Sequence, residues 1–445
     1  MRVLLIFDIG KTNKKALLFD EAYEVVWKNS VVIPFIKDED GYLCDDLAAI
    51  TTWMEQQLNA VRKQNDFTLA GINCTAYGAT LVYLDHTLQP MLPLYDYGKP
   101  YPEKISDTFF EKYGRETWSL ETASPVLYSL NSGLQLYRMK EERPQLYANV
   151  KCCLHLPDYF SYFLSGALYA ELTSIGCHTG LWNFREKKYH RWVSAERLNE
   201  VLPPIISDHA TYFNKNKHET CLVGTALHDS SAALIPYTNS IRESFVLLST
   251  GTWSITLNPF NHSPLTKEQL QADCLCYLSP QGNPVKAARL HAGNYHDVHA
   301  QRISEHFHIR PEGLTQLKYD EQKRLTKSIS AGRNSFASEE MNSFTSYEIA
   351  YYSLMQDIIA QQVASTSLVL QKDTRKIFVD GGFGKNEIFM QLLAGSFPEK
   401  EVFAAVVGEA TALGGALHMH KSWNKNPVPE KLLSLRRYLP ANVIV

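Results

Sequence analysis

The chain opens with two short apolar runs separated by a polar segment. Val3 to Phe7 is apolar throughout, Asp8 to Lys15 is polar and contains Gly10, and Ala16 to Phe19 is apolar again. Two runs of strand length around a glycine-containing polar segment are typical of a β-hairpin. The pattern returns from Phe245 to Leu257, with a Gly/Thr turn in the middle. The sequence therefore predicts two hairpins of one design, one in each half of the chain.

Apolar spacing predicts further elements between and after the hairpins. Strands are expected at Tyr23 to Ile33, Leu69 to Cys74, Leu81 to Asp85 and Lys376 to Asp380. Helices are expected at Leu47 to Lys63, Ser129 to Lys140, Asp158 to Leu164, Ser346 to Leu370, Glu387 to Ser396 and Gly408 to Ala416. The segment from Pro90 to Pro102 is too rich in proline and tyrosine for regular structure, which favours a binding loop.

The length of the chain indicates two domains. A chain of 445 residues exceeds what one hydrophobic core usually serves, so we expect two domains of roughly 200 residues. The boundary is predicted between Ile235 and Glu243, because the second hairpin begins at Phe245. This gives an N-terminal domain over residues 1–236 and a C-terminal domain over residues 237–445. Residues 261–345 have the least regular pattern.

Composition and charge exclude several classes of partner. The chain is 45% apolar and 20% charged, and its net charge is −3, so no general attraction to nucleic acid or to an acidic membrane is expected. No apolar stretch approaches the roughly 20 residues of a membrane span, and the N-terminal apolar run leads directly into Asp8 without a cleavage-like site. We therefore expect a cytoplasmic protein.

The cysteines and histidines do not have the spacing of a metal site. Eight cysteines are scattered along the chain, and none forms a C-x-x-C pair, so reduced and partly buried thiols are expected. Five histidines between His291 and His308 lack a compact set of acidic or thiol partners.

The tip of the first hairpin suits a polyanion such as phosphate. Gly10 permits close approach of the backbone, Thr12 and Asn13 offer donors, and Lys14 and Lys15 offer charge. Asp8, at the end of the preceding strand, is placed to hold a metal ion or a water. An isolated turn of this kind is more often an ordinary hairpin. Because two such turns occur, we expect one nucleotide between two similar halves.

Asp229 is the candidate general base. It follows an apolar strand that ends in His228, and small helix-forming residues come directly after it. An aspartate in this place is either the N-cap of the helix or a carboxylate presented to a substrate, and one residue can do both. A second strand ends at Asp380 and runs into a glycine-rich turn, which is either a tight strand-to-helix connection or a surface for a flat or phosphorylated ligand.

The order of these motifs resembles that of the FGGY carbohydrate kinases, within the actin, hexokinase and heat-shock chaperone ATPase superfamily. The matching segments are Asp8-Ile-Gly-Lys-Thr-Asn-Lys-Lys15, Leu156-Pro-Asp-Tyr159, His228-Asp229, Ser249-Thr-Gly-Thr-Trp253, Asp380-Gly-Gly-Phe-Gly-Lys-Asn386 and Glu409-Ala-Thr-Ala-Leu-Gly414. Each is weak alone, but six in one order along nearly the whole chain are specific.

The resemblance implies an α/β fold of two ribonuclease-H-like, actin-like ATPase domains with a ligand cleft between them. It implies ATP and Mg²⁺ as cofactors, with Asp8 near the metal and Asp229 as the catalytic base. Phosphate contacts are expected from Gly10, Thr12, Asn13, Lys14, Lys15, Thr250, Gly251 and Thr252. The adenosine side is expected to contact Gly381, Gly382, Gly384 and Asn386.

Within the family, the His-Asp pair followed by serine and small residues is most similar to the rhamnulokinases, which implies a ketose such as rhamnulose. Residues expected to contact the sugar are Thr75, Tyr77, Gly78, Asp96, His228, Asp229, Ser230 and Asn294. The chain departs from the family pattern at Lys11, at Tyr77-Gly-Ala-Thr80 and at Tyr95-Asp-Tyr-Gly98. These departures concern the identity of the sugar more than ATP binding.

Two functional classes follow. The first is an ATP-dependent sugar kinase, for which a phosphate site, a metal site and a base all have candidates. The second is a non-enzymatic, actin-like nucleotide switch or a sugar-sensing regulator derived from a kinase, which would need no carboxylate facing a sugar. Because members of the family are often dimeric, a homodimer is one option for the quaternary structure.

Overall fold

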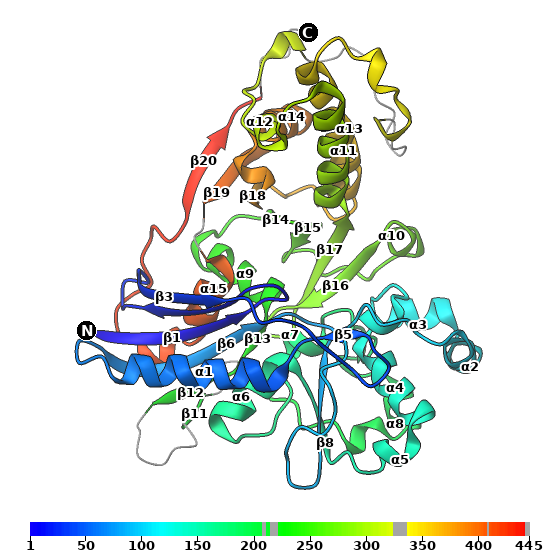
Figure 1. The fold of residues 1–445 in the computed structure, drawn as a ribbon, viewed down its shortest axis with the longest axis vertical. Helices are drawn as coiled ribbons and strands as arrows, with labels where there is room; N and C mark the ends of the chain where they lie inside the picture. The colour runs from blue at the N-terminus through cyan, green and yellow to red at the C-terminus, as the bar shows by residue number, and fades with distance from the viewer. Residues whose placement is uncertain (207–210, 214–220, 324–335, 407–408, 441–445) are drawn as a thin grey trace.

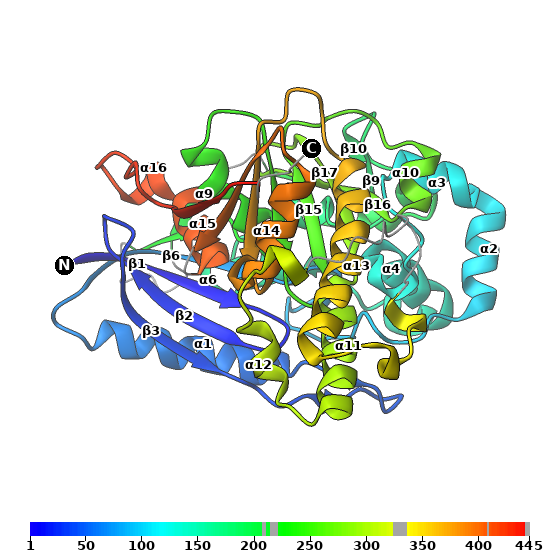
Figure 2. The ribbon, with the colours of Figure 1, turned by 90° about the horizontal axis from the view of Figure 1, so that it is seen from above.

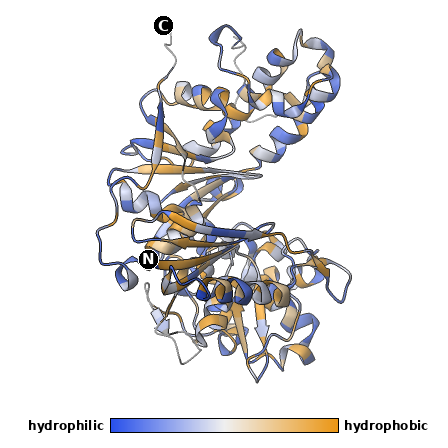
Figure 3. Ribbon diagram, turned by 60° about the vertical axis from the view of Figure 1, so that its left-hand side comes forward, coloured by the Kyte–Doolittle hydropathy of each residue, from blue (hydrophilic) through white to orange (hydrophobic). Residues whose placement is uncertain are grey.

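The computed structural model describes residues 1–206, 211–213, 221–323, 336–406 and 409–440, and two β-sheets dominate it. In Figure 1 the sheet that contains β1 lies in the lower half of the molecule, and the sheet that contains β14 lies in the upper half. Helices cover both sheets, as the view from above also shows (Figure 2). Apolar residues concentrate along the strands inside each half, while polar residues follow the outer helices and loops (Figure 3).

The first sheet has the strand order β11-β12-β6-β1-β2-β3, and β13 also pairs with β6. Its strands are β1 (Arg2–Ile9), β2 (Lys14–Phe19), β3 (Val25–Val31), β6 (Thr68–Ala76), β11 (Thr211–Phe213), β12 (Leu222–Gly224) and β13 (Leu227–His228). β1, β2 and β3 are antiparallel neighbours, whereas β6 runs parallel to β1, β12 and β13. The carboxyl ends of β1, β6 and β13 therefore meet at one edge of the sheet.

Alternate residues of β1 face two different layers of helices, as expected for a buried strand. Val3, Leu5 and Phe7 pack with α1 (Leu47–Arg62) and α6 (Leu156–Ser165). Leu4 and Ile6 pack on the other face with α9 (Asp229–Ser240) and α15 (Ala410–His418).

A lobe of short elements extends the first half. Its helices are α2 (Glu103–Tyr113), α3 (Arg115–Glu121), α4 (Ser132–Glu142), α5 (Pro144–Tyr147), α7 (Leu172–Ile175) and α8 (Arg191–Ala195), with 3₁₀ turns η1 (Tyr128–Leu130) and η2 (Leu198–Glu200). Its two-stranded sheets pair β4 (Ile36–Lys37) with β5 (Leu43–Cys44), β7 (Leu81–Leu84) with β8 (Cys152–His155), and β9 (Trp182–Asn183) with β10 (Lys188–Tyr189).

The second sheet has the strand order β16-β17-β15-β14-β18-β19-β20. Its strands are β14 (Phe245–Thr250), β15 (Ser254–Asn258), β16 (Cys274–Leu278), β17 (Pro284–Leu290), β18 (Lys376–Gly381), β19 (Glu401–Val406) and β20 (Ser434–Tyr438). Its helices are α10 (Lys267–Gln271), α11 (Ala292–Phe307), α12 (Pro311–Thr315), α13 (Tyr347–Ser367) and α14 (Glu387–Ser396), with 3₁₀ turns η3 (Glu321–Lys323), η4 (Phe336–Ser338), η5 (Met341–Ser343) and η6 (Phe383–Lys385). α16 (His420–Trp423) follows α15 and packs against the first sheet.

Helix α9 lies between the two sheets, together with α15 (Figure 1). Its residues Ala232 and Ile235 pack with the first sheet, and Leu234 and Tyr237 pack with the second. The helix that begins at Asp229 thus contacts both halves of the molecule.

The predicted hairpins and the long helices at Leu47, Ser346 and Glu387 are confirmed. The helix expected from Ser129 to Lys140 is instead divided at Asn131. Asn131 has an extended backbone, and its side-chain Nδ2 donates to the carbonyl oxygen of His178, 2.7 Å away. This contact with a distant segment overrides the local helical pattern. The last predicted helix begins at Ala410, and Gly408 lies outside the described residues.

Three general expectations can be compared with the described residues. All eight cysteines are free and buried. None of the described helices is both long and apolar enough to cross a membrane. The described parts of the chain contain no group of three or more His, Cys, Asp or Glu side chains arranged to hold a metal ion.

Candidate active site

Strand register brings the main candidates together at the carboxyl edge of the first sheet. Asp8 of β1 lies opposite Thr75 of β6, and Thr75 lies opposite Leu227 of β13. Asp229 follows β13 directly as the first residue of α9. The structure therefore places Asp8, Thr75 and Asp229 at one sheet edge, although 221 positions separate the two aspartates.

Asp8 is a buried carboxylate with two polar neighbours. The Thr75 hydroxyl donates a hydrogen bond of 3.0 Å to Asp8 Oδ1, and Lys15 Nζ lies 3.6 Å from Asp8 Oδ2. Burial raises the pKa of Asp8 to about 6, and the positive charge of Lys15 opposes that rise. The negative charge of Asp229 also raises the pKa of Asp8.

Asp229 accepts hydrogen bonds from its own neighbours and keeps part of its surface open. Its Oδ1 accepts from the Ser230 amide at 2.5 Å and from the Ser230 hydroxyl at 3.2 Å. Solvent reaches 32% of its side chain, yet burial raises its pKa to about 6. The N-cap residue of α9 is His228, so Asp229 does not serve as the N-cap. A carboxylate of raised pKa is a stronger base than an ordinary one and is still largely ionised at pH 7.5.

His228 is a buried, neutral imidazole beside Asp229. Its Nε2 lies 3.2 Å from Asp229 Oδ1 and 3.0 Å from Cys177 Sγ, and its ring stacks on Tyr277 at 5.6 Å. Burial lowers the pKa of His228 to about 3, so the ring carries no charge near neutral pH. A Cβ atom at Gly78 would lie 2.9 Å from this ring and 2.8 Å from Cys177 Sγ. Gly78 therefore leaves the space that His228 occupies.

The first predicted phosphate turn is closed by a hydrogen bond from the Gly10 amide to the Asn13 carbonyl oxygen, 3.0 Å long. Thr12 and Asn13 are exposed at its tip. Lys15 is half-buried, and its ammonium lies 2.7 Å from Glu409, at the start of α15. The tip donors and Lys15 are thus accessible to an anion.

The structure does not bring Lys14 to this site. Lys14 is fully buried, and its ammonium lies 2.8 Å from Asp45 Oδ1 and donates to the Lys11 carbonyl oxygen at 2.9 Å. Lys14 and Lys15 are neighbours on a strand, so their side chains point to opposite faces. The expected phosphate contact of Lys14 is therefore corrected to a structural ion pair with Asp45.

The second turn joins β14 to β15. Thr250 is turned toward β18, because its hydroxyl donates to the Asp380 carbonyl oxygen at 2.5 Å and accepts from the Phe383 amide at 3.0 Å. Gly251 and Thr252 are exposed. The backbone amide of Asn294 donates to the Thr252 carbonyl oxygen at 3.1 Å, so the structure places Asn294 beside this turn in the second half.

The glycine-rich segment after β18 is first of all a tight strand-to-helix connection. Gly381 has a φ of +89°, and a Cβ atom there would lie 1.9 Å from the Thr250 carbonyl oxygen. A Cβ at Gly384 would lie 2.9 Å from the Val379 carbonyl oxygen, whereas Gly382 faces open space. Close packing against the backbone therefore explains the glycines at 381 and 384. Packing does not explain Gly382, which faces open space where a ligand could lie.

Asn386 has both ends of its amide occupied within the protein. Its oxygen accepts from the Phe389 amide at 3.0 Å and caps α14, and its nitrogen donates to the Tyr351 hydroxyl at 2.8 Å. Asn386 is buried, so the structure gives it a structural role in place of the expected adenosine contact.

Sequence reasoning missed two acids that organise the site. Asp45 lies 2.6 Å from Lys11 and accepts a 2.8 Å hydrogen bond from the Tyr77 hydroxyl. Asp45 precedes Asp46, the N-cap of α1, so the pair looks like an ordinary capping signal. Glu409 begins the segment Glu409–Gly414 that resembles the family, but the sequence does not predict its ion pair with Lys15.

Two models of known domains match this chain. The N-terminal domain of the FGGY family of carbohydrate kinases matches residues 3–235, and the FGGY carbohydrate kinase C-terminal domain matches residues 242–427. The chain is 23% identical to a rhamnulokinase of Halalkalibacterium halodurans over 91% of this chain and 88% of that protein. It is 21% identical to an L-fuculokinase of Salmonella typhi over 57% of this chain and 56% of that protein.

Solved structures share the fold. A carbohydrate kinase from Novosphingobium aromaticivorans superposes with a TM-score of 0.80 at 21% identity, covering 98% of this chain and 96% of that one. A ligand-bound xylulose kinase from Lactobacillus acidophilus gives a TM-score of 0.82 at 15% identity, covering 99% and 94%. The two domain models together cover most of the sequence, and this chain therefore belongs to the FGGY family of carbohydrate kinases.

Proposed function

We propose that this protein transfers the γ-phosphoryl group of ATP to a hydroxyl of a small ketose such as rhamnulose. The kinase class follows from family membership. The ketose is supported by the rhamnulokinase relatives and by the His228-Asp229 pair, with a serine at position 230. The observation that carries the proposal is the meeting of Asp8 and Asp229 at one sheet edge, beside a turn that offers Lys15 and free donors.

Asp229 is the proposed general base. A sugar hydroxyl is a poor nucleophile, and a carboxylate that accepts its proton as the O–P bond forms assists the attack. His228 lies 3.2 Å from the Asp229 carboxylate and is neutral, so it can orient either Asp229 or the sugar without competing for the proton. Thr75, Tyr77 and Asp96 are the other proposed sugar-side residues of the first half, and Gly78 acts by leaving room for His228.

ATP is the proposed phosphoryl donor, and the residues present fit its phosphates. Thr12, Asn13 and Lys15 in the first half and Gly251 and Thr252 in the second offer amide, hydroxyl and ammonium donors at two exposed turns. Asp8 fits Mg²⁺, because this ion is commonly held by one or two carboxylates together with substrate phosphates. When bound, Mg²⁺ would neutralise charge on the transferring phosphoryl group.

We propose that the two halves of the molecule bind different substrates. Residues 1–236 would bind the sugar and supply the base, and residues 237–445 would bind most of the nucleotide, with α15 and α16 returning to the first sheet. A cytoplasmic location and a homodimer remain expectations from the sequence and the family.

A screen of ketoses, aldoses and polyols for sugar-dependent release of ADP from Mg-ATP tests the proposal. We expect one or a few ketoses to stimulate ADP release far above the rate with ATP alone. Stimulation only by aldoses or polyols would contradict the ketose. Release of ADP that no sugar stimulates would contradict the kinase and favour the nucleotide-switch alternative.

A further inference from the structure

Lys11 has contacts that neither the phosphate turn nor the base requires. It lies in the turn between β1 and β2, and its ammonium is 2.6 Å from Asp45 Oδ2 and 2.5 Å from Asp96 Oδ2. The same nitrogen faces aromatic rings, with centres 5.1 to 5.3 Å away, of Phe35, Tyr77 and Tyr97. Cations at this distance from ring faces are attracted to them. Lys11 thus links the proposed phosphate turn to the loop that carries Asp96 and Tyr97.

The two acids depend on Lys11 to different degrees. Asp45 also contacts the ammonium of Lys14 at 2.8 Å and accepts from the Tyr77 hydroxyl at 2.8 Å. Asp96 accepts from the Gly98 amide at 2.6 Å, and Lys11 is the only cation in contact with it within the described ranges of the chain. Removing the charge of Lys11 therefore leaves Asp45 paired but leaves Asp96 without a cation.

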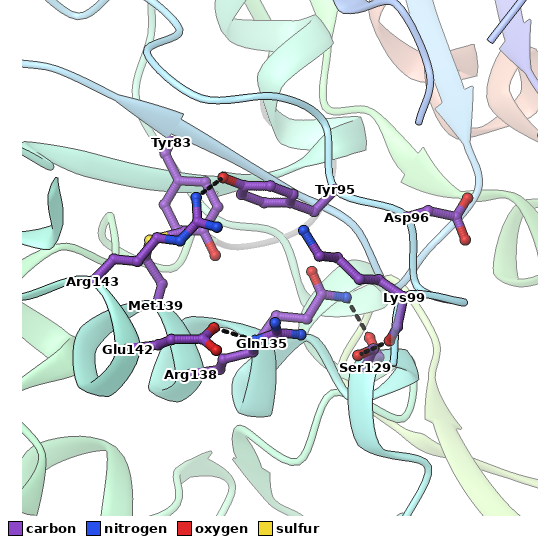
Figure 4. Close-up of a pocket in the computed structure, with 10 residues that line it drawn as sticks. All are labelled: Tyr83, Tyr95, Asp96, Lys99, Ser129, Gln135, Arg138, Met139, Glu142 and Arg143. Atoms are coloured by element: carbon purple, nitrogen blue, oxygen red, sulfur yellow. Dashed lines mark hydrogen bonds and ion pairs between the residues drawn. The ribbon is translucent and has the colours of Figure 1, made fainter. Parts of the chain in front are cut away.

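The other end of this loop is fastened separately. Lys99 is buried, and its ammonium lies 2.6 Å from Asp38 and 2.7 Å from Asp40. Ser129 donates to the Lys99 carbonyl oxygen at 2.6 Å. Lys99 and Ser129 line a cavity of about 40 Å³, and Asp96 lies at its edge and points away from the other side chains (Figure 4). The loop from Asp96 to Lys99 is therefore fixed at Lys99 by one ion-pair group and at Asp96 by Lys11.

Tyr97, between these two anchors, contacts Tyr77, one of the proposed sugar-side residues. Its ring meets the ring of Tyr77 edge-on, with centres 6.4 Å apart. Burial raises the pKa of Tyr97, and the charges of Lys11 and Asp229 both act on it, which is consistent with a ring near the proposed base. A shift of the Asp96 end of the loop would therefore move Tyr97 and Asp96 relative to Asp229.

We propose that Lys11 is a positioning residue for the sugar, which fastens the Asp96–Lys99 loop to the turn between β1 and β2. The inference rests on the proposed kinase function. It adds that Lys11 sets the position of the loop that contacts the sugar. Lys11 acts through its contacts with Asp96 and Tyr97.

The charge of Lys11 is constant over the working pH range. Burial alone would lower its pKa, but the hydrogen bonds from Lys11 to Asp45 and Asp96 outweigh this effect and raise the pKa above its ordinary value. Lys11 therefore stays charged, and its ion pair with Asp96 does not act as a pH switch.

Steady-state kinetics of Lys11→Met and Lys11→Arg test the proposal, with the best sugar from the screen. We expect Lys11→Met to raise the KM for the sugar by about tenfold or more, because Asp96 loses its charge-assisted hydrogen bond and is no longer held in place for the sugar. The KM for ATP should stay within about threefold, because only the sugar side loses its anchor. Lys11→Arg should recover most of the affinity for the sugar. The matched control is Lys267→Met, which removes a half-exposed lysine paired with Glu116 at 2.7 Å.

Amide hydrogen exchange of the unliganded protein gives a readout that needs no substrate. Peptides that cover residues 94–101 should exchange faster in Lys11→Met, and at the wild-type rate in Lys11→Arg and Lys267→Met. Lys11→Met should still unfold cooperatively, because Asp45 keeps Lys14 and Tyr77. Asp96→Asn, which retains the Lys11–Asp45 pair, should raise the KM for the sugar and should also reproduce the faster exchange of residues 94–101, which loss of a direct sugar contact would not cause.

Three results would overturn the positioning role. The first is that residues 94–101 exchange at the wild-type rate in Lys11→Met. The second is that Lys11→Met raises the KM for ATP as much as the KM for the sugar. The third is that Lys11→Met does not fold while Asp96→Asn has a normal KM for the sugar. A wild-type protein that phosphorylates no sugar would instead remove the proposed function, and hydrogen exchange would still decide whether Lys11 fastens the loop.

Discussion

Asp229 is the residue on which the proposed chemistry depends. A positioned carboxylate that accepts the proton of the attacking hydroxyl typically contributes on the order of 10² to 10⁴ in rate. Asn has the same shape and can keep the bond from the Ser230 amide, so Asp229→Asn should fold and bind ATP nearly normally while turnover falls by about that factor. Steady-state kinetics, ATP titration and thermal melting measure the three properties.

Asp46→Asn is the matched control, because Asp46 also stands at the start of a helix and caps α1 through the Ala49 amide. It should leave turnover near the wild-type value. If Asp229→Asn keeps turnover within about threefold and loses stability sharply, Asp229 is a structural residue and the proposed mechanism fails.

The raised pKa of Asp229 also predicts how stability depends on pH. Burial raises this pKa from 3.8 to about 6, so between these values the native state holds a proton that the unfolded state has lost. The stability that the protonated carboxyl contributes is present below about pH 4 and is lost as the pH rises through about 6. Asn does not titrate, so Asp229→Asn should gain stability relative to the wild type as the pH rises from 4 to 7.

Urea unfolding of both proteins at pH 4, 5.5 and 7 measures the difference in unfolding free energy. A difference that is constant, or that shrinks toward pH 7, would show that the native environment does not disfavour the ionised carboxylate. The result is independent of any sugar. Because the charge of Asp229 also raises the pKa of Asp8, its removal makes the ionised Asp8 less unfavourable and adds to the gain in the same direction.

At the level of single residues, the sequence identified polar groups at strand ends but not their partners. Asp8 and Asp229 were recognisable because each interrupts an apolar run at the point where a strand ends. Lys14 and Lys15 looked equivalent, yet one is buried against Asp45 and the other reaches Glu409. Alternation along β2 separates them, but the choice of face depends on partners 31 and 394 positions away.

At the level of elements, helices with an apolar stripe were predictable and elements held by distant contacts were not. Burial of one face fixes α1, α13 and α14 close to their expected bounds. The break at Asn131 and the two-residue strand β13 arise from contacts with His178 and with β6, which no local pattern records.

The turn between β14 and β15 should act mainly on the nucleotide. Thr252 is exposed at a glycine turn, and its hydroxyl has no hydrogen bond among the described contacts, so it is available to a phosphate oxygen. Thr252→Ala should therefore raise the KM for ATP several-fold and change the KM for the sugar little. Thr108→Ala, at an exposed threonine of α2, is the control. A defect confined to the sugar would mean that this turn belongs to the sugar side.

At the level of the whole molecule, the return of the chain to the first sheet was outside the reach of sequence reasoning. α15 packs against α9 so closely that a Cβ at Gly414 would lie 1.9 Å from the Ala232 carbonyl oxygen. The Tyr237 hydroxyl of α9 donates to Asp380 of β18 at 3.1 Å. The two halves are thus joined through a central pair of helices. They also touch directly where Ala123 packs with Cys274 and Cys276 and the Cys276 amide donates to the Ala123 carbonyl oxygen at 3.0 Å. Rotation of one half against the other would have to shift these contacts.

We expect the two halves to close when ATP and sugar are both bound. The proposed phosphate turns lie in different halves, so one nucleotide can contact both only if they approach, and a site without bulk water strengthens the electrostatic stabilisation of the transferring group. Small-angle scattering should show a radius of gyration that decreases from the roughly 22 Å typical of a chain of this length. Asp229→Asn with Mg-ATP and sugar provides a ternary complex that turns over slowly, and each ligand alone should give a smaller change. An unchanged radius of gyration in the ternary complex would show that the halves are already in their final arrangement. The β1–β2 turn and the β14–β15 turn would then have to contact one nucleotide without any movement of α9 and α15.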